Sequence, residues 1–120
     1  MEFSQLASYL FHSQTQIHIF HLQTNSYAEH KAFQKYYESI DGLMDNLIES
    51  YQGKYGVITS YASFTLHSYQ GVEQAIAYFD TLCSYINQLF NSIEDTFLQN
   101  QLDEITTLIK STVYKLKYLK

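Results

Sequence analysis

The chain has 120 residues, of which 46% are hydrophobic, so it is long enough to build one core and too short for two. Its net charge is −5, it contains no arginine, and four of its seven lysines lie after residue 109, a balance that argues against a nucleic-acid surface. No stretch approaches the roughly 18 continuous apolar residues of a membrane span, and the N-terminus lacks the pattern of a signal peptide. The single cysteine, Cys83, excludes an internal disulfide, and we expect a protein of the reducing cytoplasm.

The first half of the chain predicts two helices. Apolar residues recur at steps of three and four from residue 2 to 24 and again from residue 27 to 51, which is the spacing of one helical face. Asn25 and Ser26 predict the turn between them, and Glu29 stands where a capping box would place it. Gln52 and Gly53 predict the end of the second helix.

Residues 53–71 predict a long connection. The run from Val57 to Leu66 is rich in β-branched and aromatic residues, so by propensity alone it suits a strand. A lone strand would have no partner, and we therefore expect a short helix or an ordered crossover. A connection of this length lets the helices on either side run parallel, as in ferritin-like bundles.

The second half predicts two further helices, over residues 72–90 and 95–119, with Asn91 or Ser92 as the cap of the last one. The expected fold class is thus all-α: one four-helix-bundle domain spanning residues 1–120, with a long crossover of the kind that ferritin-like bundles have.

Aromatic residues of the chain fall on the inward helical faces or outside them. We expect the inward face of the second helix to contain Phe33, Tyr37, Ile40, Met44, Leu47 and Tyr51. Several other tyrosines fall outside the inward stripes and predict surface aromatics of the kind enriched at protein interfaces: Tyr36, Tyr55, Tyr61, Tyr69, Tyr78 and Tyr85.

Histidines and carboxylates form the candidate site. His21 closes the first predicted helix and His30 opens the second, so the two can face each other across the turn. Asp41, Asp45 and Glu49 follow at steps of four, which stacks three like charges on one helical stripe that needs solvent or a cation. A solvated acidic face with hydrogen-bonded histidines is one interpretation. Mixed imidazole and carboxylate ligands for iron, zinc or manganese are the other.

The segment from His21 to His30, continued to Glu49, resembles the signature of the Dps-type mini-ferritins. In that family one histidine ends the first helix and another opens the second, and an Asp and a Glu follow 15 and 19 residues later; Asp45 and Glu49 stand at these distances from His30. The resemblance extends over roughly residues 5–118 and is motif-like over residues 21–49. Two positions differ: Gln34 replaces an Asp and Leu22 replaces a Trp.

The resemblance implies a homo-oligomeric shell built from two-fold dimers, with an iron site between two subunits. His21 and His30 would come from one chain, and Asp45 and Glu49 from its mate. It also implies ferroxidase activity and iron storage. The exchange of the family's Asp for Gln34 is expected to affect iron oxidation more than metal binding. The competing hypothesis is a ferritin-like protein without this chemistry, serving as a structural or interaction module, for example of a bacteriophage.

Overall fold

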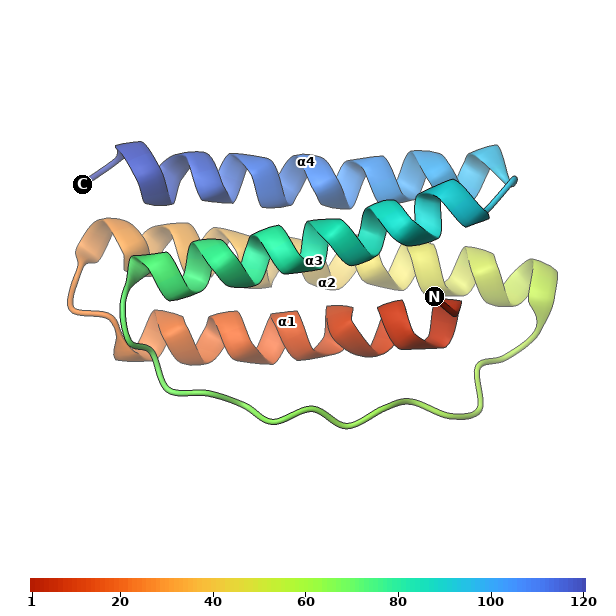
Figure 1. The fold of residues 1–120 in the computed structure, drawn as a ribbon, viewed down its shortest axis with the longest axis horizontal. Helices are drawn as coiled ribbons and strands as arrows, with labels where there is room; N and C mark the ends of the chain where they lie inside the picture. Colours follow the sequence, from red (N-terminus) through yellow and green to blue (C-terminus); the bar gives the residue numbers. More distant parts are fainter.

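A computed structural model describes residues 1–120 and contains four helices and no strand, which confirms the predicted all-α fold class (Figure 1). The helices are α1 (Phe3–Gln23), α2 (Tyr27–Tyr55), α3 (Val72–Ser92) and α4 (Thr96–Tyr118). α1 and α4 run in one direction, and α2 and α3 run in the other (Figure 1). The longest dimension, 43 Å, is the length expected for the 29 residues of α2 at about 1.5 Å each.

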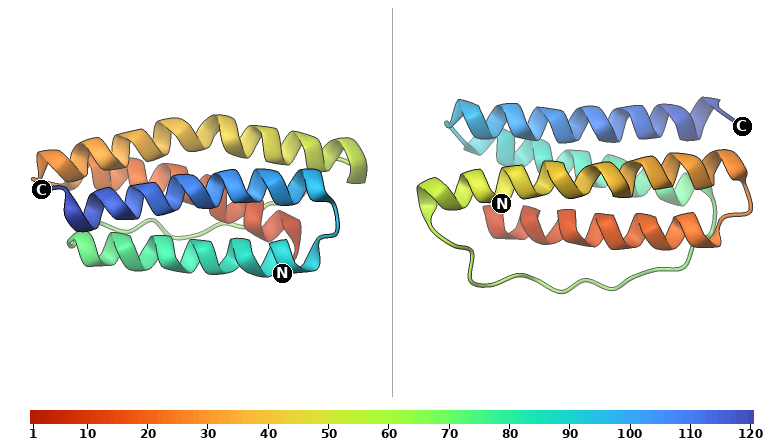
Figure 2. Two further views of the ribbon diagram at one scale, coloured as in Figure 1. Left: turned by 90° about the horizontal axis from the view of Figure 1, so that it is seen from above. Right: turned by 180° about the vertical axis from the view of Figure 1, so that it is seen from behind.

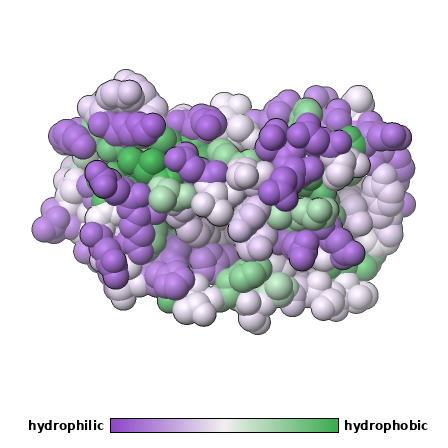
Figure 3. Space-filling view, in the orientation of Figure 1, coloured by the Kyte–Doolittle hydropathy of each residue, from purple (hydrophilic) through white to green (hydrophobic).

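The helices pack as a ring in which α1 and α4 each lie beside both α2 and α3, as the two further views show (Figure 2). Their buried apolar residues form one cluster of 24, whose members recur along each helix mainly at steps of three and four. On the face seen in Figure 3, hydrophobic residues form separate patches among hydrophilic ones. None of the four helices combines the length and hydropathy needed to cross a bilayer.

The start of α2 is capped as predicted, but only in part. The backbone N–H of Glu29 donates to the Ser26 hydroxyl at 3.3 Å. The Glu29 carboxylate does not return the bond to Ser26; it accepts hydrogen bonds from the hydroxyls of Thr24 and Tyr69, both at 2.7 Å. Glu29 therefore ties the α1–α2 turn to the connection that precedes α3.

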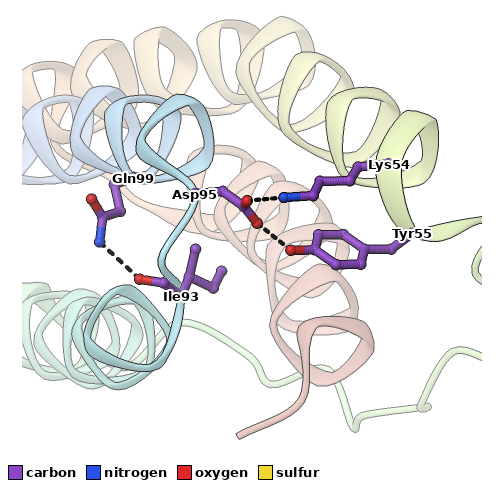
Figure 4. Close-up of polar contacts among 5 residues, drawn as sticks. All are labelled: Lys54, Tyr55, Ile93, Asp95 and Gln99. Atoms are coloured by element: carbon purple, nitrogen blue, oxygen red, sulfur yellow. Dashed lines mark hydrogen bonds and ion pairs between the residues drawn. The ribbon is translucent and has the colours of Figure 1, made fainter.

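The end of α2 lies beyond the predicted stop at Gly53. The helix continues through this residue to Tyr55 and ends at Gly56, whose φ of 94° is a conformation that favours glycine. Side chains of the last turn reach across to the α3–α4 turn: Lys54 and the Tyr55 hydroxyl both donate to the Asp95 carboxylate (Figure 4). These contacts stabilise one more helical turn than the position of Gly53 predicts.

Asp95 occupies the N-cap position of α4, instead of the predicted Asn91 or Ser92. Its hydrogen bonds from Lys54 and Tyr55 hold the pKa of its carboxyl below the usual range, and the same contact raises the pKa of Lys54. In the turn itself, the Gln99 side-chain amide donates to the Ile93 carbonyl at 2.8 Å (Figure 4). The cap was mispredicted because the Asp95 carboxylate binds Lys54 and Tyr55, which lie 41 and 40 positions away, and makes no hydrogen bond to its own helix.

The register of α2 differs from the predicted one at adjacent tyrosines. Tyr36, expected outside the inward face, is fully buried, and its hydroxyl donates to the Ser13 hydroxyl at 2.7 Å while Ser13 donates to the Leu10 carbonyl. Tyr37, expected inside, is half-buried beside α1. The other tyrosines divide in the same way: Tyr69, Tyr78 and Tyr85 pack against the core, whereas Tyr55 and Tyr61 are exposed.

Residues 56–71 contain neither helix nor strand and run along the bundle in an extended path (Figure 1). Side chains of α1 take the place of a neighbouring strand. The Gln16 amide both accepts from the backbone N–H of His67 (2.7 Å) and donates to its carbonyl (2.8 Å). His12 Nε2 donates to the Thr65 carbonyl at 2.8 Å, and the Ser8 hydroxyl accepts from the backbone N–H of Ala62 at 2.9 Å. Backbone groups of this β-prone segment thus find hydrogen-bond partners without a sheet.

Candidate functional site

The structure brings His21 and His30 together at the α1–α2 turn. Their rings stack with centroids 3.7 Å apart and planes 21° from parallel. Each ring bonds the other residue's backbone: His21 Nδ1 lies 2.7 Å from the His30 carbonyl, and His30 Nδ1 lies 2.9 Å from the His21 carbonyl. His21 is buried and His30 is half-buried. The pair is therefore held by two reciprocal hydrogen bonds.

These contacts determine where the ring protons are. A carbonyl oxygen only accepts, so both Nδ1 atoms must carry a proton and donate it. In the neutral ring, each Nε2 then holds a free lone pair. Neither Nε2 atom is both buried and without a hydrogen-bond partner, because Gln101 Oε1 is the only side-chain N or O atom in that state. A ring N–H given to a carbonyl and a free second nitrogen are the usual state of metal-binding histidines.

The tautomers can be measured directly. We expect the neutral imidazoles of both His21 and His30 to be the Nδ1–H form, which is the minor form of free histidine in water. Long-range ¹H–¹⁵N correlation spectra at alkaline pH distinguish the two forms for each ring. His67, whose side chain is exposed, serves as the reference and should be mainly Nε2–H. Nε2–H signals from His21 and His30 would rule out the reciprocal hydrogen bonds.

Further aromatic rings surround the pair. His18 stacks on Tyr37 with ring centroids 4.0 Å apart, and Tyr37 meets His21 edge to face at 5.2 Å. His18 and Tyr37 also line a groove between α1 and α2, together with Leu22 and Asp41. His21 thus contacts two rings, that of His30 by stacking and that of Tyr37 edge to face.

Asp45 and Glu49 do not meet the histidines within one chain. Both are exposed on α2, and the 15 helical residues from His30 to Asp45 rise about 22 Å. No three histidine, cysteine, aspartate or glutamate side chains of a single chain lie close enough together to hold a metal ion. One chain thus supplies two nitrogen donors at one place and two carboxylates at another.

The two carboxylates have no partner within the chain. The protein's single ion pair joins Lys54 to Asp95, at the far end of α2. Asp41, the third member of the predicted stripe, accepts a hydrogen bond from Gln14 on α1 at 3.2 Å and so faces the groove. Asp45 and Glu49 remain free to bind a cation or a second molecule.

Sequence reasoning did not identify Tyr37 and Gln16 as residues that position the site and the connection. The signal for Gln16 was present, because a polar residue interrupts the apolar face of α1 there. Tyr37 gave no separate signal, because its neighbour Tyr36 has the same side chain and only packing distinguishes them.

The fold and the site define a class: an all-α four-helix protein with a histidine pair at its first turn and free carboxylates on its second helix. Residues 21–116 match the model of a family described as "Family of unknown function (DUF5856)", and the chain belongs to this family. Comparison with the curated proteins and with the solved structures finds no significant match.

Proposed function

We propose that this protein is a ferritin-like iron-binding protein of the Dps type, whose metal site forms between two copies of the chain. His21 and His30 of one copy and Asp45 and Glu49 of the other supply the ligands. The observation that carries the proposal is the pair of reciprocal bonds from Nδ1 to carbonyl, because they hold two adjacent imidazoles with unprotonated Nε2 atoms.

The helix arrangement supports this proposal. Ferritin-like bundles have one long crossover between their second and third helices, and here residues 56–71 make such a connection between two parallel helices (Figure 1). No other element covers the outer side of α2 (Figure 2, right). Two copies can therefore approach through α2, which carries both His30 and the carboxylates.

Iron is the substrate in this account. Two imidazoles and two carboxylates suit Fe(II), and an incomplete ligand shell leaves a position for dioxygen or peroxide, which accepts the electron as Fe(II) becomes Fe(III). The net charge of −5 favours cation uptake into a shell made of such subunits. Zinc and manganese match the same donors, and iron oxidation distinguishes iron from zinc.

The test is aerobic addition of Fe(II) to the purified protein. Near-ultraviolet absorbance of Fe(III) should grow faster with wild type than in buffer, and His30→Ala with Glu49→Ala should abolish the difference. The matched control is His67→Ala with Glu104→Ala, which removes the same residue types from exposed positions of the connection and of α4 and should react like wild type. Identical traces from wild type and the His30/Glu49 variant would refute the proposal.

A second function is favoured by the exposed apolar side chains. Leu22 is 69% exposed, and Phe11 meets Tyr61 edge to face at 5.5 Å on the surface shared by α1 and the connection. Such residues suit a structural or interaction module that keeps the fold without iron chemistry. The same experiment separates the two functions, because a module without iron chemistry gives no protein-dependent oxidation.

A further inference from the structure

The outward face of α2 has a symmetric layout. Every residue on this face is exposed, and the steps between successive members are four, four, three, four, three, four and four, which read the same from either end. The members are Tyr27, Lys31, Lys35, Glu38, Gly42, Asp45, Glu49 and Gly53. The face lies opposite the buried side of α2 and is uncovered along its length (Figure 2, right).

Charged residues of this face are also placed symmetrically about its centre, with opposite signs on the two sides. Lys31 lies nine residues before Ile40 and Glu49 lies nine residues after it. Lys35 lies five residues before Ile40 and Asp45 five residues after it. The two lysines of the first half of the face thus match the two carboxylates of the second half at equal distances from Ile40, and Glu38, the one acidic residue of the first half, matches the uncharged Gly42.

We propose that this face binds a second copy of the chain, with the two α2 helices antiparallel and crossing at the level of Ile40. In this register Lys31 of each copy meets Glu49 of the other, and Lys35 meets Asp45. Two-fold symmetry doubles each contact, so the interface contains four ion pairs. A parallel arrangement would instead place like charges together, and so the charges select the antiparallel one.

The glycines of this face support the same register. Gly42 and Gly53 lie within the helix, where glycine is less favourable than alanine, and neither has a positive φ. A Cβ added at either position would meet no atom within 4 Å, so nothing in the chain itself requires glycine there. The antiparallel register sets Glu38 against Gly42 and Tyr27 against Gly53, where a missing side chain lets the helices come close.

This inference rests on the proposed function in one respect, because both require two α2 helices to meet. It differs in what holds them: lysines neutralise Asp45 and Glu49, and no metal is needed. The pairing should therefore persist in a chelator and weaken as salt screens the exposed charges.

The test is light scattering of the full chain in EDTA at low salt. Wild type should have at least twice the chain mass of 14.1 kDa. Lys31→Glu with Lys35→Glu makes all four contacts repulsive and should raise the dissociation constant more than about 100-fold. Adding Asp45→Lys and Glu49→Lys to the same chain restores opposite charges and should restore the mass. Circular dichroism confirms that each variant is folded.

A mixing experiment tests the pairing itself. The Lys31→Glu/Lys35→Glu chain and an Asp45→Lys/Glu49→Lys chain should each fail to self-associate but should form a 1:1 complex with each other. As control, Lys110→Glu with Lys117→Glu makes the same change of charge on the exposed side of α4 and should leave the mass unchanged.

Three results would overturn the inference: a wild-type monomer in EDTA, reversal variants with the wild-type mass, or a fourfold variant that folds but stays apart. The outcomes separate this inference from the proposed function. Association of wild type only when Fe(II) is added would overturn the lysine pairing and leave the metal site standing. A fourfold variant that associates but does not oxidise iron is expected if both hold, because it lacks the carboxylates.

Discussion

Replacing Tyr36 by alanine should lower the free energy of unfolding by about 3–5 kcal/mol, as is usual when a large buried aromatic residue is truncated. The Tyr36 ring is fully buried and meets Phe79 at a centroid distance of 4.9 Å, so it joins α2 to α3. Its hydroxyl is also a partner of Ser13 on α1. Urea unfolding monitored by circular dichroism measures the change.

Two companion variants make this prediction specific. Tyr36→Phe keeps the ring and loses one buried hydrogen bond, and should cost about 1 kcal/mol. Tyr37→Ala removes the same side chain one position along, where it is half-buried, and should cost no more than about 1.5 kcal/mol. A larger loss for Tyr37→Ala than for Tyr36→Ala would mean that the register of α2 is the one first expected from the sequence.

Replacing Gln16 by alanine should lower the free energy of unfolding by about 2 kcal/mol and loosen the connection between α2 and α3. The Gln16 side chain is buried and binds both backbone groups of His67. Water can reach the exposed His67 after the exchange, which limits the loss. Hydrogen exchange should show the larger change: the His67 amide should exchange at least about tenfold faster, because its acceptor is gone.

Gln14→Ala is the matched control for this variant. Gln14 lies one half-turn away on α1 and donates to Asp41 in an exposed contact. Its replacement should change the free energy of unfolding by no more than about 0.5 kcal/mol and should not affect exchange at His67. Unchanged exchange at His67 in Gln16→Ala would show that the connection is held elsewhere.

Much of the fold could be predicted from periodicity, because the spacing of apolar residues and a few turn-forming residues are enough to locate four amphipathic helices. The C-terminal end of α2 and the N-cap residue of α4 did not follow, since Lys54 and Tyr55 reach Asp95 from about 40 residues away in the sequence. The connection was ambiguous because its composition favours a strand, while its actual partners are polar side chains of α1 such as Ser8 and Gln16.

The candidate site was predictable to a similar extent. Spacing alone placed His21 and His30 on either side of a turn, and the structure stacks them. The reciprocal bonds to the two carbonyls were not predictable, because they depend on the path of the backbone through residues 24–26. The positions of Asp45 and Glu49 followed from helical rise, which already excluded a shared ion within one chain.

Mixing two inactive variants tests the site between copies most directly. One chain carries His21→Ala and His30→Ala, and the other carries Asp45→Asn and Glu49→Gln, which keep side chains of similar size. Neither chain alone has both halves of a site, but a mixed pair has one intact site of its two. We predict that each variant alone oxidises Fe(II) no faster than buffer and that an equimolar mixture, unfolded and refolded together, recovers part of the wild-type rate. A mixture as inactive as its components, with mixed pairs shown to be present, would contradict the account.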